Sequence, residues 1–502
     1  MHYTVVRRHG LEATNLSDTL AEAPPSDCVG HESGGEQSFV AEVIVDATNV
    51  VVVENEEEEH RRTRCAILGL MAAAAMALSA VAIAIKMASN SVAIASLGRS
   101  NEQSGSPSPA PTNFHSTFAP TEDSFPKVVQ ALRPVSGDFL FQEGTSANMA
   151  LDWIVNRDDL GRDPSDPRFV QRYVMAVLYF STGGDKWRQC SQEAKLCGYP
   201  NKDNFLSDSD ECDWFGNDCR NGHIHKIYFG TSVGNKLVGS LPRELAWLSE
   251  LESIILENNH LFGTIPAAYG RLKKLHTLVA TNNHLESPFP NSILDNGIME
   301  TIQIDHNNFT GKLPQQFLNQ TQLKMLLAKD NDFTGQIHPH IGQLTMLEAF
   351  EISRNQFTGT IPDVIASMKS LESFLVDSND ISGLFPPLIF SMGSLRQLNI
   401  TGNALTGTVP SQIKSFGSAL PTRHRKFVLL ANNKFHGTVP LEVASIADLN
   451  ELTLHGNNFT GPCPSALCAL KTGQHEKSYS LTLLTSDCSK VDCKCSEACI
   501  CF

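Results

Sequence analysis

The chain has 502 residues, of which 41% are hydrophobic and 19% are charged, and its formal net charge is -15. This length accommodates two or three folded units, and the composition is ordinary for a globular protein. The acidic balance leaves no basic stripe that could neutralise phosphates, which argues against nucleic acid as a partner.

Residues 1–64 are predicted to form a disordered, acidic cytoplasmic tail. The segment is poor in aromatic residues and ends near the run ENEEEE at 54–59, which a folded chain cannot bury. Within it, the apolar stretch 39–53 is the one candidate for a strand or a docking segment.

Residues 65–86 predict a transmembrane helix, because 65–85 is a run without a charged side chain. A helix of that length spans roughly 31 Å, which matches a bilayer core of about 30 Å. The alternatives are a buried soluble helix and a cleaved signal peptide, and the long preceding segment argues against the signal peptide. Arg61, Arg62 and Arg64 flank the run and predict that the amino terminus faces the cytoplasm.

Cysteines and glycosylation sequons support the same topology. Apart from Cys28 and Cys65, all of the 13 cysteines follow the predicted span. Four sequons also follow it, at Asn308, Asn319, Asn399 and Asn458. Both features are typical of an oxidising, extracellular compartment. We therefore expect a single-pass protein of the plasma membrane, with an extracellular carboxyl side.

Residues 87–125 are rich in Ser, Pro and Thr and predict an extended stalk. A helical, cysteine-rich cap is expected over 126–223. Apolar side chains recur at helical spacing in 147–155 and in 167–180, which predicts two helices there. The pair Gly183-Gly184 ends the second helix.

Residues 224–468 repeat a single phrase, marked by a column of asparagines. Eight of them are 24 residues apart, the next follows after 30, and the last after 24 again: Asn235, Asn259, Asn283, Asn307, Asn331, Asn355, Asn379, Asn403, Asn433 and Asn457. A fixed period of this length indicates leucine-rich repeats.

Each position of the phrase has a structural role. In one repeat, Leu347, Phe350 and Ile352 point inward from a short strand and its entry. The inward amide of Asn355 is expected to bond backbone groups of neighbouring repeats, so that the column forms a ladder. Gly359 permits a tight turn and Pro362 begins the convex side.

The repeats resemble the plant-type leucine-rich repeat family, whose pattern is N-x-L-x-G-x-I-P. The pattern stands here at 259–266 and at 403–410. The resemblance implies an α/β solenoid, a curved horseshoe of about ten repeats with caps at both ends. Departures are local: Ser287 replaces the Gly, His338 replaces the Pro, and six extra residues lie near 415–424.

The cysteine clusters resemble the caps of plant-type leucine-rich repeat receptors. The phrase CDWFGNDC at 212–219 carries the likeness. It implies that Cys190, Cys197, Cys212 and Cys219 pair among themselves, and a zinc site is the alternative. A carboxyl-terminal cap is expected over 469–502. Together with Cys463 and Cys468, which precede it, this end of the chain has seven further cysteines. Because seven is odd, one thiol stays free, bonds another chain or bonds the amino-terminal cap.

No motif for chemistry stands out. The chain has no phosphate loop, nucleophile elbow or H-E-x-x-H motif, so we predict no enzyme activity, cofactor or metal. His338 and His340 are interpreted as ordinary surface residues of a convex turn. The related receptor kinases end in a cytosolic kinase domain, and the tail here has none, so signalling would need a separate partner such as a co-receptor kinase.

The concave face is the predicted ligand site. Its outward column is mostly apolar, and acidic residues outnumber basic ones around it, which favours a basic or polar partner. The candidate residues are Ile255, Val279, Gln303, Asp305, Leu327, Lys329, Glu348, Glu351, Arg354, Leu375 and Asp377. A glycan on Asn399 would close off the last repeats.

Two functions follow from this reading. The first is a cell-surface receptor-like protein that binds a protein, peptide or glycan on the concave face. The alternative is a structural or adhesive protein of the cell surface or wall. A chemically varied concave face, as here, favours the first.

Overall fold

The computed structural model describes residues 4–6, 42–45, 50–53, 125–192, 197, 201–421, 424–471, 481–487, 490–492 and 500–501. The chain divides into two compact units, residues 1–112 and 113–502. The predicted membrane span, residues 65–86, lies outside the described residues, as do Cys28, Cys65 and all but the last residue of the stalk. Within the described ranges, no helix is long and apolar enough to cross a bilayer.

The first unit contains three short strands. β3 (Val50–Val53) pairs in parallel with β1 (Thr4–Val6) and antiparallel with β2 (Glu42–Val45). Valine and isoleucine favour strands because their branched side chains restrict the torsion χ1 and pack well on a pleated surface, and they dominate all three segments. The apolar stretch 39–53, the candidate for a strand within the predicted tail, supplies two of the three strands.

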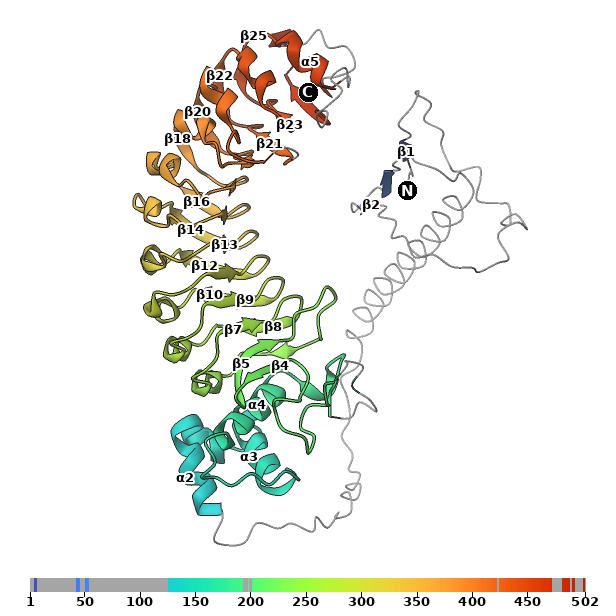
Figure 1. Ribbon diagram of the computed structural model, residues 1–502, viewed down its shortest axis with the longest axis vertical. Coiled ribbons are helices and arrows are strands. Elements are labelled where there is room, and N and C mark those ends of the chain that lie inside the picture. Colours follow the sequence, from blue (N-terminus) through green and yellow to red (C-terminus); the bar gives the residue numbers. More distant parts are fainter. Residues whose placement is uncertain are drawn as a thin grey trace, which may run out of the picture. The chain divides into compact units, whose positions relative to one another are not determined.

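The second unit is a solenoid built on a thirteen-stranded sheet, whose strands follow the chain order of the repeats. Every pair in this sheet is parallel except β4 with β5. Its strands are β4 (Asn217–Arg220), β5 (His223–Tyr228), β7 (Ser253–Ile255), β9 (Thr277–Val279), β11 (Thr301–Gln303), β13 (Met325–Leu327), β15 (Ala349–Glu351), β17 (Ser373–Leu375), β19 (Gln397–Asn399), β21 (Lys426–Leu429), β23 (Leu449–Thr453), β26 (Leu483–Ser486) and β28 (Ile500–Cys501). Figure 1 shows this sheet on the inner side of an arc.

Each repeat continues into a second short strand beside the first sheet. These strands are β6 (Val238–Gly239), β8 (His260–Gly263), β10 (His284–Pro288), β12 (Asn308–Lys312), β14 (Asp332–Gln336), β16 (Gln356–Thr358), β18 (Ser382–Leu384), β20 (Ala404–Gly407), β22 (Lys434–Gly437) and β24 (Asn458–Phe459). They form a six-stranded and a four-stranded parallel sheet. We call their solvent side the lateral face.

The convex side consists of 3-10 helices, one per repeat. They are η5 (Arg243–Trp247), η6 (Ala267–Arg271), η7 (Asn291–Asn296), η8 (Gln315–Asn319), η9 (Ile341–Gln343), η10 (Asp363–Ser367), η11 (Pro387–Ser391), η12 (Ser411–Ser415) and η13 (Leu441–Ser445). In most of them a proline precedes the helix and fixes its entry. The α/β solenoid predicted from the sequence is thus confirmed.

The asparagine column forms the predicted ladder. Asn331 Oδ1 accepts a hydrogen bond from Phe309 N of the preceding repeat at 3.0 Å. Its Nδ2 donates to Ile304 O of that repeat at 2.9 Å and to Ala328 O and Lys329 O of its own. The same pattern recurs at the neighbouring asparagines, for example Asn307 and Asn355.

Between the sheets and the convex helices lies a continuous apolar core. Phenylalanines of successive repeats stack along it: the ring centroids of Phe309 and Phe333 are 6.0 Å apart, and those of Phe350 and Phe374 are 5.8 Å apart. Ser287, which replaces a glycine of the phrase, adopts φ 79. The glycine-like turn is therefore kept despite the side chain.

The amino-terminal cap contains α2 (Phe125–Ser136), η3 (Gly137–Phe141), α3 (Ser146–Asn156), α4 (Phe169–Ser181) and η4 (Gly184–Lys186). The two predicted helices correspond to α3 and α4. Inside the cap the guanidinium of Arg172 lies over the rings of Trp153 and Trp214, 5.3 and 4.6 Å from their centroids. It is fully buried and forms two hydrogen bonds to the carboxylate of Asp158, at 2.6 and 2.8 Å.

Disulfides close the cap over the first repeat. Cys190 bonds Cys197, and Cys212 bonds Cys219. These bonds leave no thiolate for the zinc alternative. At the other end, a short helix, α5 (Ser465–Lys471), and strands β25 (Gly461–Pro462) and β27 (Val491–Asp492) follow the last repeat. Cys463 is buried there.

The pairing predicted for Cys463 and Cys468 stays a prediction, because the side chain of Cys468 lies outside the described residues. The cysteines at 488, 493, 495 and 499 lie outside them as well, and the structure describes only the backbone of Cys501.

We expect Asn331→Ala to lower the free energy of unfolding by about 2 kcal/mol, because it removes the acceptor of the buried Phe309 N–H and one hydrogen bond each to Ile304 O, Ala328 O and Lys329 O. Urea unfolding of the full-length protein, followed by circular dichroism, measures the change. Asn291→Ala, on an exposed convex position, is the control and should change stability little. Equal effects of the two variants would contradict the role assigned to the ladder.

Candidate functional site

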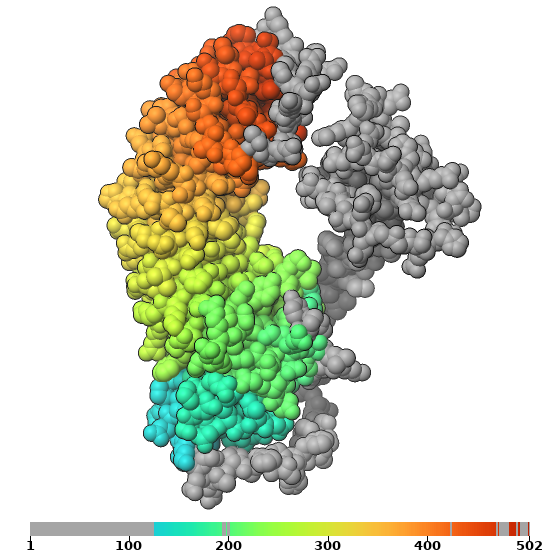
Figure 2. Space-filling model, viewed as in Figure 1, coloured from blue at the N-terminus to red at the C-terminus, as the bar shows by residue number. Residues whose placement is uncertain are grey.

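The sequence-predicted ligand residues lie together on the solvent side of the thirteen-stranded sheet. Parallel register aligns them: Gln303 pairs with Leu327, Leu327 with Glu351, and Glu351 with Leu375. This side lines the inside of the arc, which we call the concave face, and Figure 2 shows the hollow between the green and orange repeats. The structure therefore brings the predicted column onto one surface.

The apolar residues of this column are half-buried. Ile255, Leu327 and Leu375 are partly exposed, whereas Val279 is only 7% exposed. The sequence interpretation placed Val279 fully outward. Curvature brings neighbouring strands of a concave sheet closer on the inner side, so the side chains cover one another.

The charged residues differ in exposure too. Glu348 and Arg354 are exposed, as expected. Asp305 is only 9% exposed, in contrast to its predicted outward position. Its carboxylate accepts hydrogen bonds from Lys329 N at 2.8 Å and from Thr281 Oγ1 at 3.4 Å. Asp305 is therefore in part a structural residue of the concave sheet.

Burial changes the titration of these carboxyl groups. Burial and, after it, the nearby Asp305 carboxylate together raise the pKa of Glu351 to about 6, while Lys329 opposes the rise. Burial also raises the pKa of Asp305, against the hydrogen bond from Lys329 N. The centre of the concave face thus holds negative charge that water solvates poorly.

Ion pairs within the concave face take up part of the acidic surplus. Lys324 pairs with Glu300 at 2.9 Å, and Arg396 with Glu372 at 3.2 Å. Arg354 pairs with Asp330 at 3.5 Å, and the His306 ring lies 3.0 Å from the same carboxylate. Glu351, in the central column, lies between these pairs along the sheet, and Asp377 lies in the same repeat as Glu372.

Sequence reasoning missed a hydrogen-bond network on the same face. Asp377 Oδ1 accepts from Ser353 Oγ at 2.6 Å and from Asn399 Nδ2 at 2.8 Å. The positions of Ser353 and Asp377 are 24 residues apart, which was the available signal. Asn399 is half-buried, and its Nδ2 is the atom that would carry a glycan, whereas Asn308, Asn319 and Asn458 are exposed. Glycosylation at all four stays a prediction.

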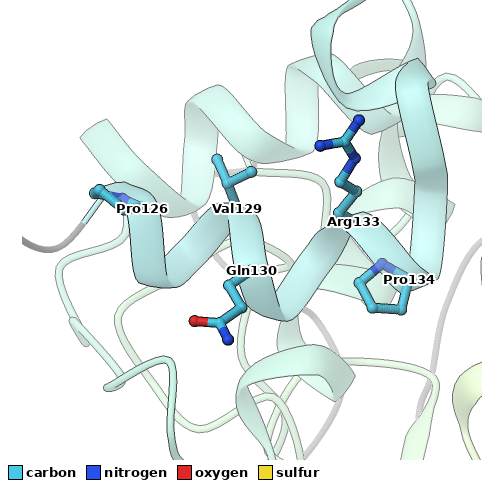
Figure 3. Close-up of a pocket in the computed structure, with 5 residues that line it drawn as sticks. All are labelled: Pro126, Val129, Gln130, Arg133 and Pro134. Carbon is cyan, nitrogen blue, oxygen red and sulfur yellow. The ribbon is translucent and has the colours of Figure 1, made fainter.

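A shallow cavity lies elsewhere, on the outer face of α2. It has a volume of about 550 Å³ and is lined by Pro126, Val129, Gln130, Arg133 and Pro134. Figure 3 shows Pro126 and Pro134 near opposite ends of the row that lines it. None of the sequence-predicted site residues contributes to it. Among the described residues, no group of three His, Cys, Asp or Glu side chains could hold a metal ion.

Comparisons with known proteins agree with the repeat fold. The leucine-rich repeat family model matches residues 394–416 and 448–470. No curated protein sequence matches the chain. The chain folds as a leucine-rich repeat solenoid, and disulfide-bonded cysteines lie at the amino-terminal end of the solenoid.

Solved structures of similar fold include plant proteins. The chain is similar to a plant peptide hormone receptor, RGFR1 in complex with RGF2, at 27% identity over 51% of this chain and 38% of that one, with a TM-score of 0.45. A TDR receptor is similar at 28% identity over 50% and 42%, with a TM-score of 0.45. A plant ice-binding protein follows at 22% identity over 59% and 88%, with a TM-score of 0.49. The chain spans about two fifths of the length of the two receptors.

We expect Glu351→Gln to remove a pH dependence of stability. The pKa of this carboxyl group rises from its ordinary 4.5 to about 6 in the folded protein, so folding favours its protonated form. Protonation of Glu351 therefore stabilises the folded protein fully below about pH 4.5, and this stabilisation is lost as the pH rises through about 6. Relative to Glu351→Gln, the free energy of unfolding of the unchanged protein should fall by about 1 kcal/mol across this range, after an allowance for solvent screening.

Urea unfolding of both proteins at several pH values between these limits tests this expectation. Parallel stability curves for the two proteins would show that Glu351 titrates as an ordinary exposed carboxyl group.

Proposed function

We propose that this protein is a membrane-anchored, receptor-like protein of the cell surface that captures a protein, peptide or glycan on its concave face. The observation that carries the proposal is the half-buried apolar column of Ile255, Leu327 and Leu375, flanked by poorly solvated acidic groups. Apolar side chains in a row on the surface of a monomer are typical of interaction sites.

The charge of this surface favours a ligand with basic or polar groups. Glu351, at the centre of the column, lies among acidic neighbours, Asp305, Asp330 and Asp377, whose charges raise its pKa. A cationic group placed there would offset their mutual repulsion. Apolar contacts would supply affinity, and the acidic groups would select among partners.

The anchoring part of the proposal rests on the sequence. The uncharged run at 65–85, preceded by Arg61, Arg62 and Arg64, favours a single span with a cytoplasmic amino terminus. The two cap disulfides fit an extracellular carboxyl side. Signalling would then pass through a separate partner, such as a co-receptor kinase, and the protein would itself have no enzyme activity, metal or cofactor.

A structural or adhesive role is the second candidate, and the lateral face favours it. Hydroxyl groups of successive repeats donate to glycine carbonyls of the repeat before. The pairs are Thr334 Oγ1 to Gly311 O, Thr358 Oγ1 to Gly335 O, Ser382 Oγ to Gly359 O and Thr406 Oγ1 to Gly383 O, at 3.2, 3.2, 3.5 and 3.0 Å. This regular row of side chains would suit adhesion to a partner whose own surface is regular and uncharged.

Three variants of the full-length protein distinguish the two functions. Leu327→Asp alone, and Glu348→Lys with Glu351→Lys, should each weaken capture of the natural partner from membranes by about tenfold or more, because they disrupt the apolar column and reverse its charge. Thr358→Lys, on the lateral face, is the matched control and should not change capture.

The opposite pattern, in which only Thr358→Lys weakens binding, would support the adhesive role. If neither concave variant changes capture, the concave face is not the ligand site. Circular dichroism of each variant confirms that it folds.

A further inference from the structure

The convex side carries a basic and aromatic surface next to the amino-terminal cap. We call it the convex patch, and it consists of Phe139, Arg243, Trp247, Arg271, Lys273 and Lys274. All six side chains are exposed. None of them belongs to the concave or the lateral face. Its four cationic groups stand in contrast to the chain as a whole, whose net charge is -15.

Two arginines of the patch are each held against an aromatic ring. The guanidinium carbon of Arg243 lies 4.9 Å from the ring centroid of Phe139, and that of Arg271 lies 5.2 Å from the ring centroid of Trp247. Arg243 Nη2 also donates to Ser136 O of the cap at 2.8 Å. Because these contacts already restrict both guanidinium groups, less side-chain entropy is lost when an anion binds to them.

The repeat register places the two arginine–ring pairs close together. Trp247 and Arg271 occupy the same position in successive repeats, 24 residues apart. Arg243 and Trp247 are the two ends of η5, and the residues between them are buried. A 3-10 helix rises about 2 Å per residue, so these ends lie about 8 Å apart along its axis. The convex patch is therefore one surface over the cap, η5 and η6.

The acidic side chains near the patch leave much of its charge uncompensated. Glu250 pairs with Lys274. Glu244 lies 3.7 Å from Arg243 Nε, but it is only 6% exposed and accepts a hydrogen bond from Ser136 Oγ inside the cap boundary. Among the described residues, Arg271 and Lys273 form no ion pair. The patch can therefore attract an anion from solvent.

The patch ends after two repeats. Asp295 takes the position of Arg271 in the next repeat, and Asn319, a predicted glycosylation site, takes it in the repeat after that. Both side chains are exposed. A reversed charge and then a glycan would therefore confine an anionic ligand to the cap, η5 and η6.

We propose that the convex patch binds an acidic polysaccharide through the carboxylates of its uronate units. A planar guanidinium donates two parallel hydrogen bonds to one carboxylate, and the patch holds two such groups in place. The rings of Phe139 and Trp247, which are 47% and 36% exposed, offer apolar surface to the C–H faces of the sugar rings. The protein would thus bind a second ligand, separate from that of the concave face.

An acidic peptide fits the patch less well. An extended peptide gains affinity from backbone hydrogen bonds to a sheet edge or from side chains that enter a groove. The backbone of η5 and η6 is bonded internally, for example from Leu248 N to Leu245 O at 3.1 Å and from Leu272 N to Tyr269 O at 3.0 Å. The patch therefore offers a peptide side-chain contacts alone.

An anionic membrane fits less well too. This step rests on the topology in the proposed function, which places the repeats outside the cell. Anionic lipids concentrate in the cytoplasmic leaflet, so an extracellular patch would meet few of them. Acidic polysaccharides remain the polyanions that such a surface would meet.

Binding of an oligogalacturonate to the full-length protein in phosphatidylcholine nanodiscs, measured by calorimetry at physiological salt, tests the proposal. The methyl ester of this probe lacks its charge and should bind about tenfold or more weakly. Arg243→Gln with Arg271→Gln should lower the affinity for the acid about tenfold or more. Lys369→Gln with Lys414→Gln, at exposed convex positions of later repeats, removes the same charge and should change the affinity little.

Trp247→Leu separates the ring from the charge. It keeps every charge of the patch and should still lower the affinity for the acid by about threefold. Circular dichroism confirms that each variant folds. If the arginine double variant does not fold, Arg271→Gln decides against Lys369→Gln, because it leaves the bond from Arg243 to the cap intact.

Four results would overturn the proposal: no measurable binding of the acid, equal binding of acid and ester, equal losses in the two double variants, or an affinity that Trp247→Leu leaves unchanged. Poly-glutamate that binds as tightly as the oligogalacturonate would overturn the assignment to a polysaccharide. So would phosphatidylserine vesicles that bind the nanodiscs where the oligogalacturonate does not.

The concave variant Leu327→Asp keeps the two sites apart. It should leave oligogalacturonate binding unchanged even where it weakens capture of the natural partner. If the acid binds as expected but the concave variants leave capture unchanged, the convex patch stands and the concave-face function fails.

Discussion

The buried asparagine of each repeat joins that repeat to the one before it, and the solenoid depends on this contact. The strands of the inner sheet are mostly three residues long, so the backbone beyond them has few sheet partners. The Asn side chain replaces those partners, because an amide both donates and accepts. At the first repeat, Asn235 Oδ1 accepts instead from Gln189 N of the cap, at 2.7 Å. The cap thus begins the ladder as well as covering the apolar end of the core.

A fixed period of 24 residues also determines what the surfaces present. Once the ladder sets the register, each outward position of the phrase becomes a column along the solenoid. The concave column is apolar and acidic, and the lateral column carries hydroxyl groups.

The periodic features were predictable from the sequence, and the contacts that depend on the third dimension were not. The Asn spacing predicted the solenoid, the ladder and the outward columns, and the cysteine phrase resembled a cap whose cysteines pair locally. Arg172 gave no signal, because its partners come from segments without a repeat. The burial of Val279 and Asp305 was not predicted either. The repeat pattern indicates the direction of a side chain, but not how much of it the neighbouring side chains of a curved sheet cover. The strands at 42–53 lie in a segment whose charge suggested disorder.

Glycan placement tests most directly whether the concave face is the ligand site. Glu351→Asn creates a sequon with Ser353 on the concave face, and Gln343→Asn creates one with Thr345 on the convex side. Glycan occupancy in cells, read by mass, shows that the repeats face the lumen of the secretory pathway. The account predicts that the concave glycan abolishes capture of the natural partner while the convex glycan leaves it intact. Undiminished capture by a protein fully glycosylated at residue 351 would contradict it.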